Sequence, residues 1–275
     1  MSRITTAAKV LRRISSKLHP LSTETTHPVA VQSDPEPPRK SPSFDADHPP
    51  GDFSVLNDEL LNWMKFVNAG MLDTGNIVAM DYALARMPRG AAMIEIGSFC
   101  GLSTNVLTHL RRRYSLTCPF FTCDSWKFEG ADSPHTPMGD GGLTFGEYRR
   151  LVRDSFIRNT RAFSRHDLPQ TIELSSDDFF AAWDKCALLE DVYGRPSNVG
   201  GLIAFCYIDG DHTYPQARRD FENVDKHLKP GGFILFDDSA DGSGWEVCQL
   251  VQELLQNDKY RLIGKYGNYL FQSRS

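Results

Sequence analysis

Two stretches of this chain, about a hundred residues apart, place an apolar run directly before glycine or acidic residues. The first, at residues 94–104, reads IEIGSFCGLST. The second, at residues 207–212, reads YIDGDH and is followed at residues 229–238 by KPGGFILFDD. Open α/β sheets place ligand-binding groups at the carboxyl ends of their strands. The spacing therefore predicts one ligand site built from several strand ends.

Three acids follow two of the predicted strands. Asp209 ends the run at residues 202–208, and Asp237 and Asp238 end the run at residues 233–236. Neighbouring strand ends lie about 5 Å apart. Carboxylates this close repel each other unless one is protonated, water separates them or a cation binds. Mg²⁺ or a similar hard divalent ion prefers oxygen ligands, so Asp209, Asp237 and Asp238 are the candidate metal ligands.

Asp211 and His212 lie just past the strand predicted at residues 202–208 and are the candidate general bases. Each residue also has a structural interpretation. Asp211 can cap the turn into a helix that begins near Pro215, and His212 can stabilise the loop or pack on a ligand. The sequence leaves both interpretations open.

Gly97 and Gly101 fall between an apolar strand and a predicted helix. Glycine allows tight turns and close backbone approach, and the helix that begins near Ser103 offers amide donors to an anionic group. The spacing is Gly-x-x-x-Gly, which argues against the dinucleotide pattern G-x-G-x-x-G. Asp124 ends the next strand, where an acid can accept from ribose hydroxyls. A simple strand-to-helix turn is the structural alternative.

Together these segments resemble the class I S-adenosylmethionine (SAM)-dependent methyltransferases, and within them the metal-dependent small-molecule O-methyltransferases. Glu95 before the glycine loop, with Cys100, Gly101 and Ser103 in it, is similar to the catechol-type enzymes. The Asp237-Asp238 pair resembles the sugar O-methyltransferases that tailor macrolide and aminocoumarin antibiotics. Residues 208–214, IDGDHTY, also resemble a broad bacterial group of methyltransferase-like proteins near the cephalosporin hydroxylase proteins.

The resemblance assigns roles to individual residues. It implies that Glu95 contacts the cofactor near its amino group, that Asp211 occupies the general-base position of the sugar enzymes, and that His212 stands where catechol enzymes carry a lysine. Ser175 and its neighbours border the expected adenine position. The residues expected around SAM are Glu95, Gly97, Ser98, Gly101, Ser103, Asp124, Ser125, Ser176, Asp177 and Asp209.

The implied activity is transfer of a methyl group to a hydroxyl of a small molecule, a sugar diol or catechol-like compound. Two vicinal hydroxyls would chelate the metal, which acidifies one of them. Two alternatives stay open. One is a methyltransferase that acts on another atom or a macromolecule without metal, and the other is a non-catalytic methyltransferase-like protein.

Strands that alternate with helices predict an α/β fold with a mostly parallel sheet. We expect strands at residues 92–96, 120–123, 171–174, 202–208 and 233–236, a closing hairpin at residues 260–272, and a helix at residues 177–189. The resemblance implies a doubly wound, Rossmann-like sheet of seven strands, with a final antiparallel strand and helices on both faces. The long connection at about 125–170 predicts an inserted lid-like segment.

Residues 1–50 differ from the domain predicted at residues 51–275. Residues 28–50 contain seven prolines and few large apolar side chains, which predicts a disordered tail. Residues 1–20 carry five basic residues and no acid, with apolar side chains on one helical face. This pattern suits organelle import, association with a membrane surface or a solvated basic tail.

The 275 residues carry a formal charge of -5, which gives no electrostatic reason to expect a nucleic-acid partner. No apolar run is long enough to form a transmembrane segment. The six cysteines form no CxxC pair, which favours free thiols in a reducing compartment and a cytoplasmic location. The expected partner is a small-molecule acceptor, and a homo-oligomer is left open.

Overall fold

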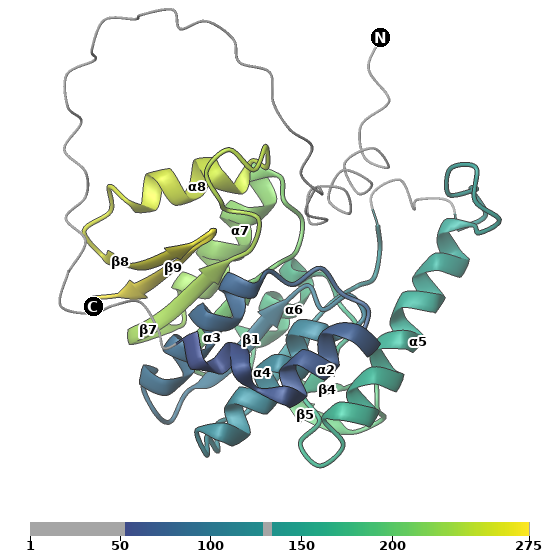
Figure 1. Cartoon of the computed structure of the whole chain (residues 1–275), viewed down its shortest axis with the longest axis horizontal. Helices are drawn as coiled ribbons and strands as arrows, with labels where there is room; N and C mark the ends of the chain where they lie inside the picture. The colour runs from purple at the N-terminus through teal and green to yellow at the C-terminus, as the bar shows by residue number, and fades with distance from the viewer. Residues whose placement is uncertain (1–52, 129–133, 275) are drawn as a thin grey trace, which may run out of the picture. The chain divides into compact units, whose positions relative to one another are not determined.

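Seven strands form one mixed sheet in the computed structural model, which describes residues 53–128 and 134–274 (Figure 1). The strand order is β3-β2-β1-β6-β7-β9-β8. The first five strands in that order are parallel to one another, β9 is antiparallel to β7, and β8 is antiparallel to β9. The predicted α/β sheet with a final antiparallel strand is therefore confirmed.

The strands of this sheet are short at one edge and longer at the other. Their bounds are β1 Ala92–Ile96, β2 Phe120–Cys123, β3 Gln170–Ile172, β6 Ile203–Ile208, β7 Leu228–Phe236, β8 Tyr260–Tyr266 and β9 Asn268–Ser273. All six residues of β6 are buried, as the continuous apolar run predicts for a strand covered on both faces.

Helices cover both faces of the sheet. They are the short 3-10 helix η1 Phe53–Asn57 and the α-helices α2 Glu59–Val67, α3 Thr74–Arg86, α4 Leu102–Arg113, α5 Phe145–Phe163, α6 Ser176–Trp183, α7 Tyr214–Asp225 and α8 Val247–Leu254. One core cluster joins Ile94 and Cys206 to α6, α7 and α8. A second joins Met93 and Phe205, whose side chains point to the opposite face, to η1, α2, α3 and α4.

The helix predicted at residues 177–189 is shorter in the structure, where α6 ends at Trp183. The prediction is therefore wrong for residues 184–189. Strand β4, Leu188–Glu190, instead pairs with β5, Pro196–Asn198, in a small antiparallel ribbon. The helix begins at the Ser175 cap, whose hydroxyl accepts from the amide of Asp178. Its buried residues are Phe179, Phe180 and Trp183, and the amide of Asp184 closes the last turn by donating to the carbonyl of Phe180.

The long connection between β2 and β3 contains α5, which begins with a capping box between Thr144 and Glu147. Two arginines of α5 anchor the helix to the residue after β3. Arg149 Nη2 and Arg153 Nε each lie 2.7 Å from an oxygen of Glu173. The structure thus fixes α5 beside the strand ends. A lid role for this segment stays a prediction, and residues 129–133 lie outside the described residues.

The predicted tail at residues 1–50 also lies outside the described residues, so its predicted disorder and targeting roles stay predictions. Within residues 53–128 and 134–274, no helix has both the length and the apolar character needed to span a bilayer.

Candidate active site

The loop between β1 and α4 requires glycine at two positions. Gly97 has a φ of +82°, and a Cβ there would lie 2.1 Å from the carbonyl oxygen of Asp209. Gly101 has a φ of +86° and precedes the first turn of α4, where a Cβ would lie 3.1 Å from the ring of Phe156. Both positions are in the left-handed region that favours glycine. The loop can therefore pass close to the end of β6 and to α5.

Glu95 lies in β1 just before this loop, and its side chain is fully buried. Thr104 donates a hydrogen bond to Oε2, but Oε1 has no hydrogen-bond partner among the described residues. Burial raises the pKa of Glu95 to about 7, and the neighbouring hydroxyls of Ser103 and Thr104 oppose the rise. A buried acceptor without a donor is costly. A cationic group on a ligand could satisfy it.

Asp124 organises the glycine loop. Its Oδ2 accepts from the amides of Ser98 (2.8 Å) and Phe99 (3.0 Å), and its Oδ1 accepts from the amide of Trp126 (2.6 Å). Burial raises the pKa of Asp124, and these backbone hydrogen bonds oppose the rise. The predicted ribose contact stays a prediction. The structure adds that Asp124 holds the loop, a role that the sequence did not reveal.

Two buried asparagines hold the same loop from outside. The side-chain amides of Asn68, after α2, and Asn159, in α5, donate to the carbonyl of Cys100 at 3.0 and 2.9 Å. Asn105 of α4 donates to Asn68 at 2.7 Å. Sequence reasoning missed these residues, because an asparagine in a helix carries no signal of burial on its own.

The residues predicted to lie near the adenine of the cofactor fall into two groups in the structure. A cavity of about 310 Å³ lies at the ends of β2 and β3, lined by Ser125, Lys127, Arg149, Glu173, Leu174, Ser175 and Asp178. Ser176 accepts from Gln216 at 3.1 Å, and Asp177 pairs at the surface with Arg219 at 3.3 Å. Of the predicted residues on this side, Ser125 and Ser175 therefore line the cavity, whereas Ser176 and Asp177 contact α7.

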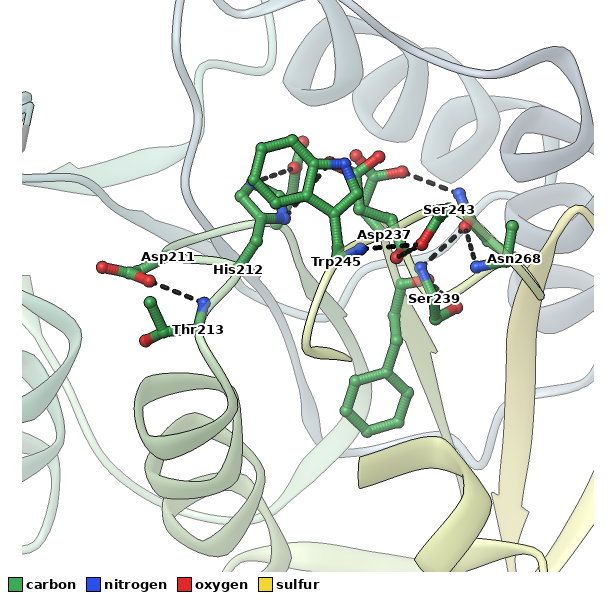
Figure 2. A network of polar contacts seen from close by, with 12 residues as sticks. Asp211, His212, Thr213, Asp237, Ser239, Ser243, Trp245 and Asn268 are labelled. Carbon is green, nitrogen blue, oxygen red and sulfur yellow. Dashed lines mark hydrogen bonds and ion pairs between the residues drawn. The ribbon is translucent and has the colours of Figure 1, made fainter. Parts of the chain in front are cut away.

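The ends of β6 and β7 bring the predicted acids into a buried polar network (Figure 2). Asp237 Oδ1 accepts from the side-chain amides of Asn76 (2.6 Å) and Asn268 (2.8 Å). Asn76 also donates to the hydroxyl of Tyr207 at 3.2 Å, which in turn donates to Asp209 Oδ2 at 3.3 Å. Both asparagines are fully buried and hold Asp237 in one orientation.

His212 lies between two of these acids. Its Nδ1 is 3.2 Å from Asp238 Oδ2, and its Nε2 is 3.9 Å from Asp209 Oδ1. The ring packs against Trp245, with 5.0 Å between the ring centroids. Asp238 has a φ of +51°, an uncommon conformation for a residue with a side chain. The structure therefore joins His212 to the acid cluster.

Asp211 is exposed and has a different environment. Its Oδ1 accepts from the amide of Thr213 at 2.8 Å, one residue before α7. Figure 2 shows the Asp211 carboxylate directed toward Thr213 and away from Asp237. The turn-capping interpretation of Asp211 therefore describes its contacts in the structure, while its predicted catalytic role stays untested.

The carboxylate oxygens of the three acids are ligands that a hard divalent ion prefers, and each acid also has partners within the chain. Within the described ranges, no group of three or more His, Cys, Asp and Glu side chains is placed to hold a metal ion. Asp237 faces two amides and Asp238 faces His212. Metal binding at Asp209, Asp237 and Asp238 stays a prediction from the sequence.

Comparison with known proteins gives one family. A family model described as a methyltransferase domain matches residues 94–239, more than half of the chain. Among curated proteins, the uncharacterized protein R132 of Acanthamoeba polyphaga mimivirus is 35% identical over 72 residues, 26% of this chain and 31% of that protein. The match thus spans about a third of that relative.

Solved structures with a similar chain path include three methyltransferases. The O-methyltransferase NovP is 15% identical, with a TM-score of 0.46, over 75% of this chain and 82% of its own. The O-methyltransferase TomG from Streptomyces achromogenes, in complex with SAM, is 16% identical, with a TM-score of 0.48, over 81% and 94%. CalS11, a calicheamicin methyltransferase, is 16% identical, with a TM-score of 0.48, over 80% and 88%.

The matched residues run from the middle of β1 to just past β7. They include the glycine loop, Asp124, His212 and the acids at the ends of β6 and β7. The family match thus covers the strand ends on which the candidate site is built, and it confirms the methyltransferase resemblance of the sequence. The chain belongs to the methyltransferase-domain family.

Proposed function

We propose that the chain is a SAM-dependent O-methyltransferase that acts on a hydroxyl of a small molecule. The observation that carries the proposal is Glu95 Oε1, a buried acceptor without a donor, beside a glycine loop in a methyltransferase domain. The ammonium group of SAM would supply the missing donors. The amides at the first turn of α4 would face its carboxylate.

The other end of the cofactor would extend toward the ends of β2 and β3. Asp124 and Ser125 follow β2, and Ser125 and Ser175 line the cavity there. SAM, when bound, supplies an electrophilic methyl group. What the chain supplies is position, because Asn68 and Asn159 hold the loop through Cys100. Positioning of the two reacting groups accounts for much of the rate of such a transfer.

The acceptor hydroxyl must lose a proton as it receives the methyl group. We propose that His212 is the general base that accepts this proton, because its ring lies beside the carboxylates of Asp238 and Asp209. An acid next to Nδ1 fixes the ring orientation and stabilises the protonated imidazole. Asp211 is the second candidate, and its engagement with Thr213 makes it the weaker one.

The proposal predicts methyl transfer to oxygen. Recombinant full-length chain should move a labelled methyl group from SAM to at least one compound in a panel of glycosides and catechols, with the label on a hydroxyl oxygen of the product. Protein and RNA fractions serve as the comparison acceptors. Label that appears only on nitrogen, carbon or a macromolecule would overturn the O-methyltransferase assignment. It would not affect the assignment of the chain to the methyltransferase-domain family.

The metal prediction has its own test. If Asp209, Asp237 and Asp238 hold a divalent ion, millimolar Mg²⁺ should raise the melting temperature of chelator-treated, SAM-loaded native chain and should not raise that of Asp237→Ala. An Asp258→Ala variant is the matched control, because Asp258 is an exposed acid between α8 and β8, outside the cluster and the expected cofactor site. A melting temperature that ignores Mg²⁺ in all three proteins would eliminate the metal and leave the His212 mechanism in place.

A further inference from the structure

Helix α2 is apolar on two sides. Leu61 and Met64 are buried in the core against α3 and α4. On another side of the same helix, Leu60, Trp63, Phe66 and Val67 recur at helical spacing and are 39%, 66%, 88% and 56% exposed. The second side is thus a solvent-facing apolar surface, which we call the α2 patch.

The α2 patch differs from the other exposed apolar residues of the described chain. Phe53 of η1, Leu143, Leu151, Leu188 and Leu202 are exposed one at a time in different elements and loops, which is normal for a protein surface. The patch instead gathers two large aromatic and two aliphatic side chains on nine residues of helix. Contiguous apolar surface of this kind marks an interaction site.

The patch is also held in place. Asp58 caps the start of α2 by accepting from the amides of Leu60 and Leu61, and its other oxygen lies 2.7 Å from His109 Nε2. At the other end, Asn68 is buried and bonded to Cys100 and Asn105. A rigid surface loses little conformational entropy on binding. The patch is therefore a prepared docking surface on a fixed helix.

We propose that the occupant of the α2 patch is a second copy of this chain, bound about a two-fold axis near Trp63. In an antiparallel pair of α2 helices, Leu60 would face the partner's Phe66, and Trp63 would face the partner's Trp63. Two-fold pairing needs such a self-complementary surface.

The area of the patch suits a dimer. Aromatic side chains bury roughly 150–250 Å² each. At the observed exposures, the four patch residues together offer on the order of 500 Å² per copy. A two-fold pair would thus bury about 1,000 Å² from these residues alone, near the lower limit for a specific interface. Residues around the patch would add to that area.

The proposed interface is close to the cofactor loop but does not depend on the proposed activity. Asn68, directly after α2, donates to the carbonyl of Cys100 in the loop. A dimer through α2 would therefore stabilise the helix end that holds the loop. The test needs only the oligomeric state, so its failure would leave the methyltransferase proposal untouched.

The test is sedimentation velocity of the full chain and of a Phe66→Ser variant, from about 1 to 100 μM. Phe66 is 88% exposed, so its replacement should not disturb folding. Native chain should sediment as a dimer of 30.9 kDa chains, and Phe66→Ser should raise the dimer dissociation constant at least about tenfold. Leu188→Ser, which removes an equally apolar residue at 65% exposure elsewhere, should sediment like the native chain.

Two results would overturn the proposal. One is a native chain that stays monomeric across the whole range. The other is a dimer that Phe66→Ser does not weaken. Vesicles of phosphatidylcholine and phosphatidylserine distinguish a different occupant, because a monomer that floats with them, and loses this binding in Phe66→Ser, would assign the patch to a lipid surface instead.

Discussion

Methyl transfer by a His212→Ala variant is expected to be about a hundred- to ten-thousandfold slower than transfer by the native chain, the usual contribution of a general base. The affinity for SAM should stay within a factor of about two, because His212 contacts the acid cluster and Trp245 rather than the glycine loop. The measurement is the initial rate at saturating SAM with an acceptor found in the screen.

Asp211→Asn is the matched control for His212→Ala. Its side chain keeps an oxygen that can accept from Thr213, so the turn before α7 should remain. We expect its rate to fall less than about tenfold. The reverse order, with a large loss in Asp211→Asn and a small loss in His212→Ala, would assign the proton to Asp211, as the sugar O-methyltransferase resemblance implies.

A Glu95→Gln variant is expected to bind SAM about ten- to a hundredfold more weakly than the native chain at pH 8. The substitution keeps the size of the side chain but removes the charge that would pair with the ammonium group, and hydrogen bonds to charged groups contribute about 1.5–3 kcal/mol. Calorimetry measures the affinity. Ser197→Ala is the control, because Ser197 Oγ is also buried without a partner but lies in β5.

The same carboxylate should make SAM binding depend on pH. Burial raises the pKa of Glu95 to about 7, so only about a tenth of the unliganded protein carries the charge at pH 6. The dissociation constant should therefore be about tenfold higher at pH 6 than at pH 8. Glu95→Gln should lose this dependence, and an unchanged pH profile in that variant would remove Glu95 from the cofactor site.

The free energy of unfolding of the unliganded protein should change with pH in the opposite direction to SAM binding, and should be larger at low pH. The pKa of Glu95 is raised in the folded chain above its ordinary value of 4.5. The unfolded chain therefore releases its proton first as pH rises. This stabilising contribution is complete below about pH 4.5 and is lost by about pH 7, a change of about 3 kcal/mol. The Glu95→Gln variant should lack this difference in stability. Chemical denaturation of both proteins at pH 4.5 and pH 7 measures it.

The strands that carry the site could be predicted closely. Strands β1 and β2 have the bounds that the sequence indicates, because each is an apolar run that ends at glycine or acid. The ribbon of β4 and β5 could not be predicted in this way. Its residues are mostly exposed, and Leu188 continues the apolar spacing of α6. Periodicity alone does not show where a helix stops burying side chains.

The sequence predicted which acidic residues gather in the candidate site. It did not predict the hydrogen bonds that hold those residues in place. The sequence indicated that acids gather at the ends of β6 and β7, which the register of those strands requires. It did not indicate that Asn76 and Asn268 hold Asp237, since α3 and β9 come together there only in the folded chain. Long-range pairing of this kind leaves no local pattern in a single sequence.

The most direct test of the central claim is a calorimetric titration of SAM into the native full-length chain at pH 8. We expect one site per chain with a micromolar dissociation constant, equivalent to about −8 kcal/mol. S-adenosylhomocysteine, which keeps the amino acid and adenosine groups, should compete for the same site. A folded chain that shows no binding at millimolar SAM would contradict the assignment of the glycine loop and Glu95 as a cofactor site.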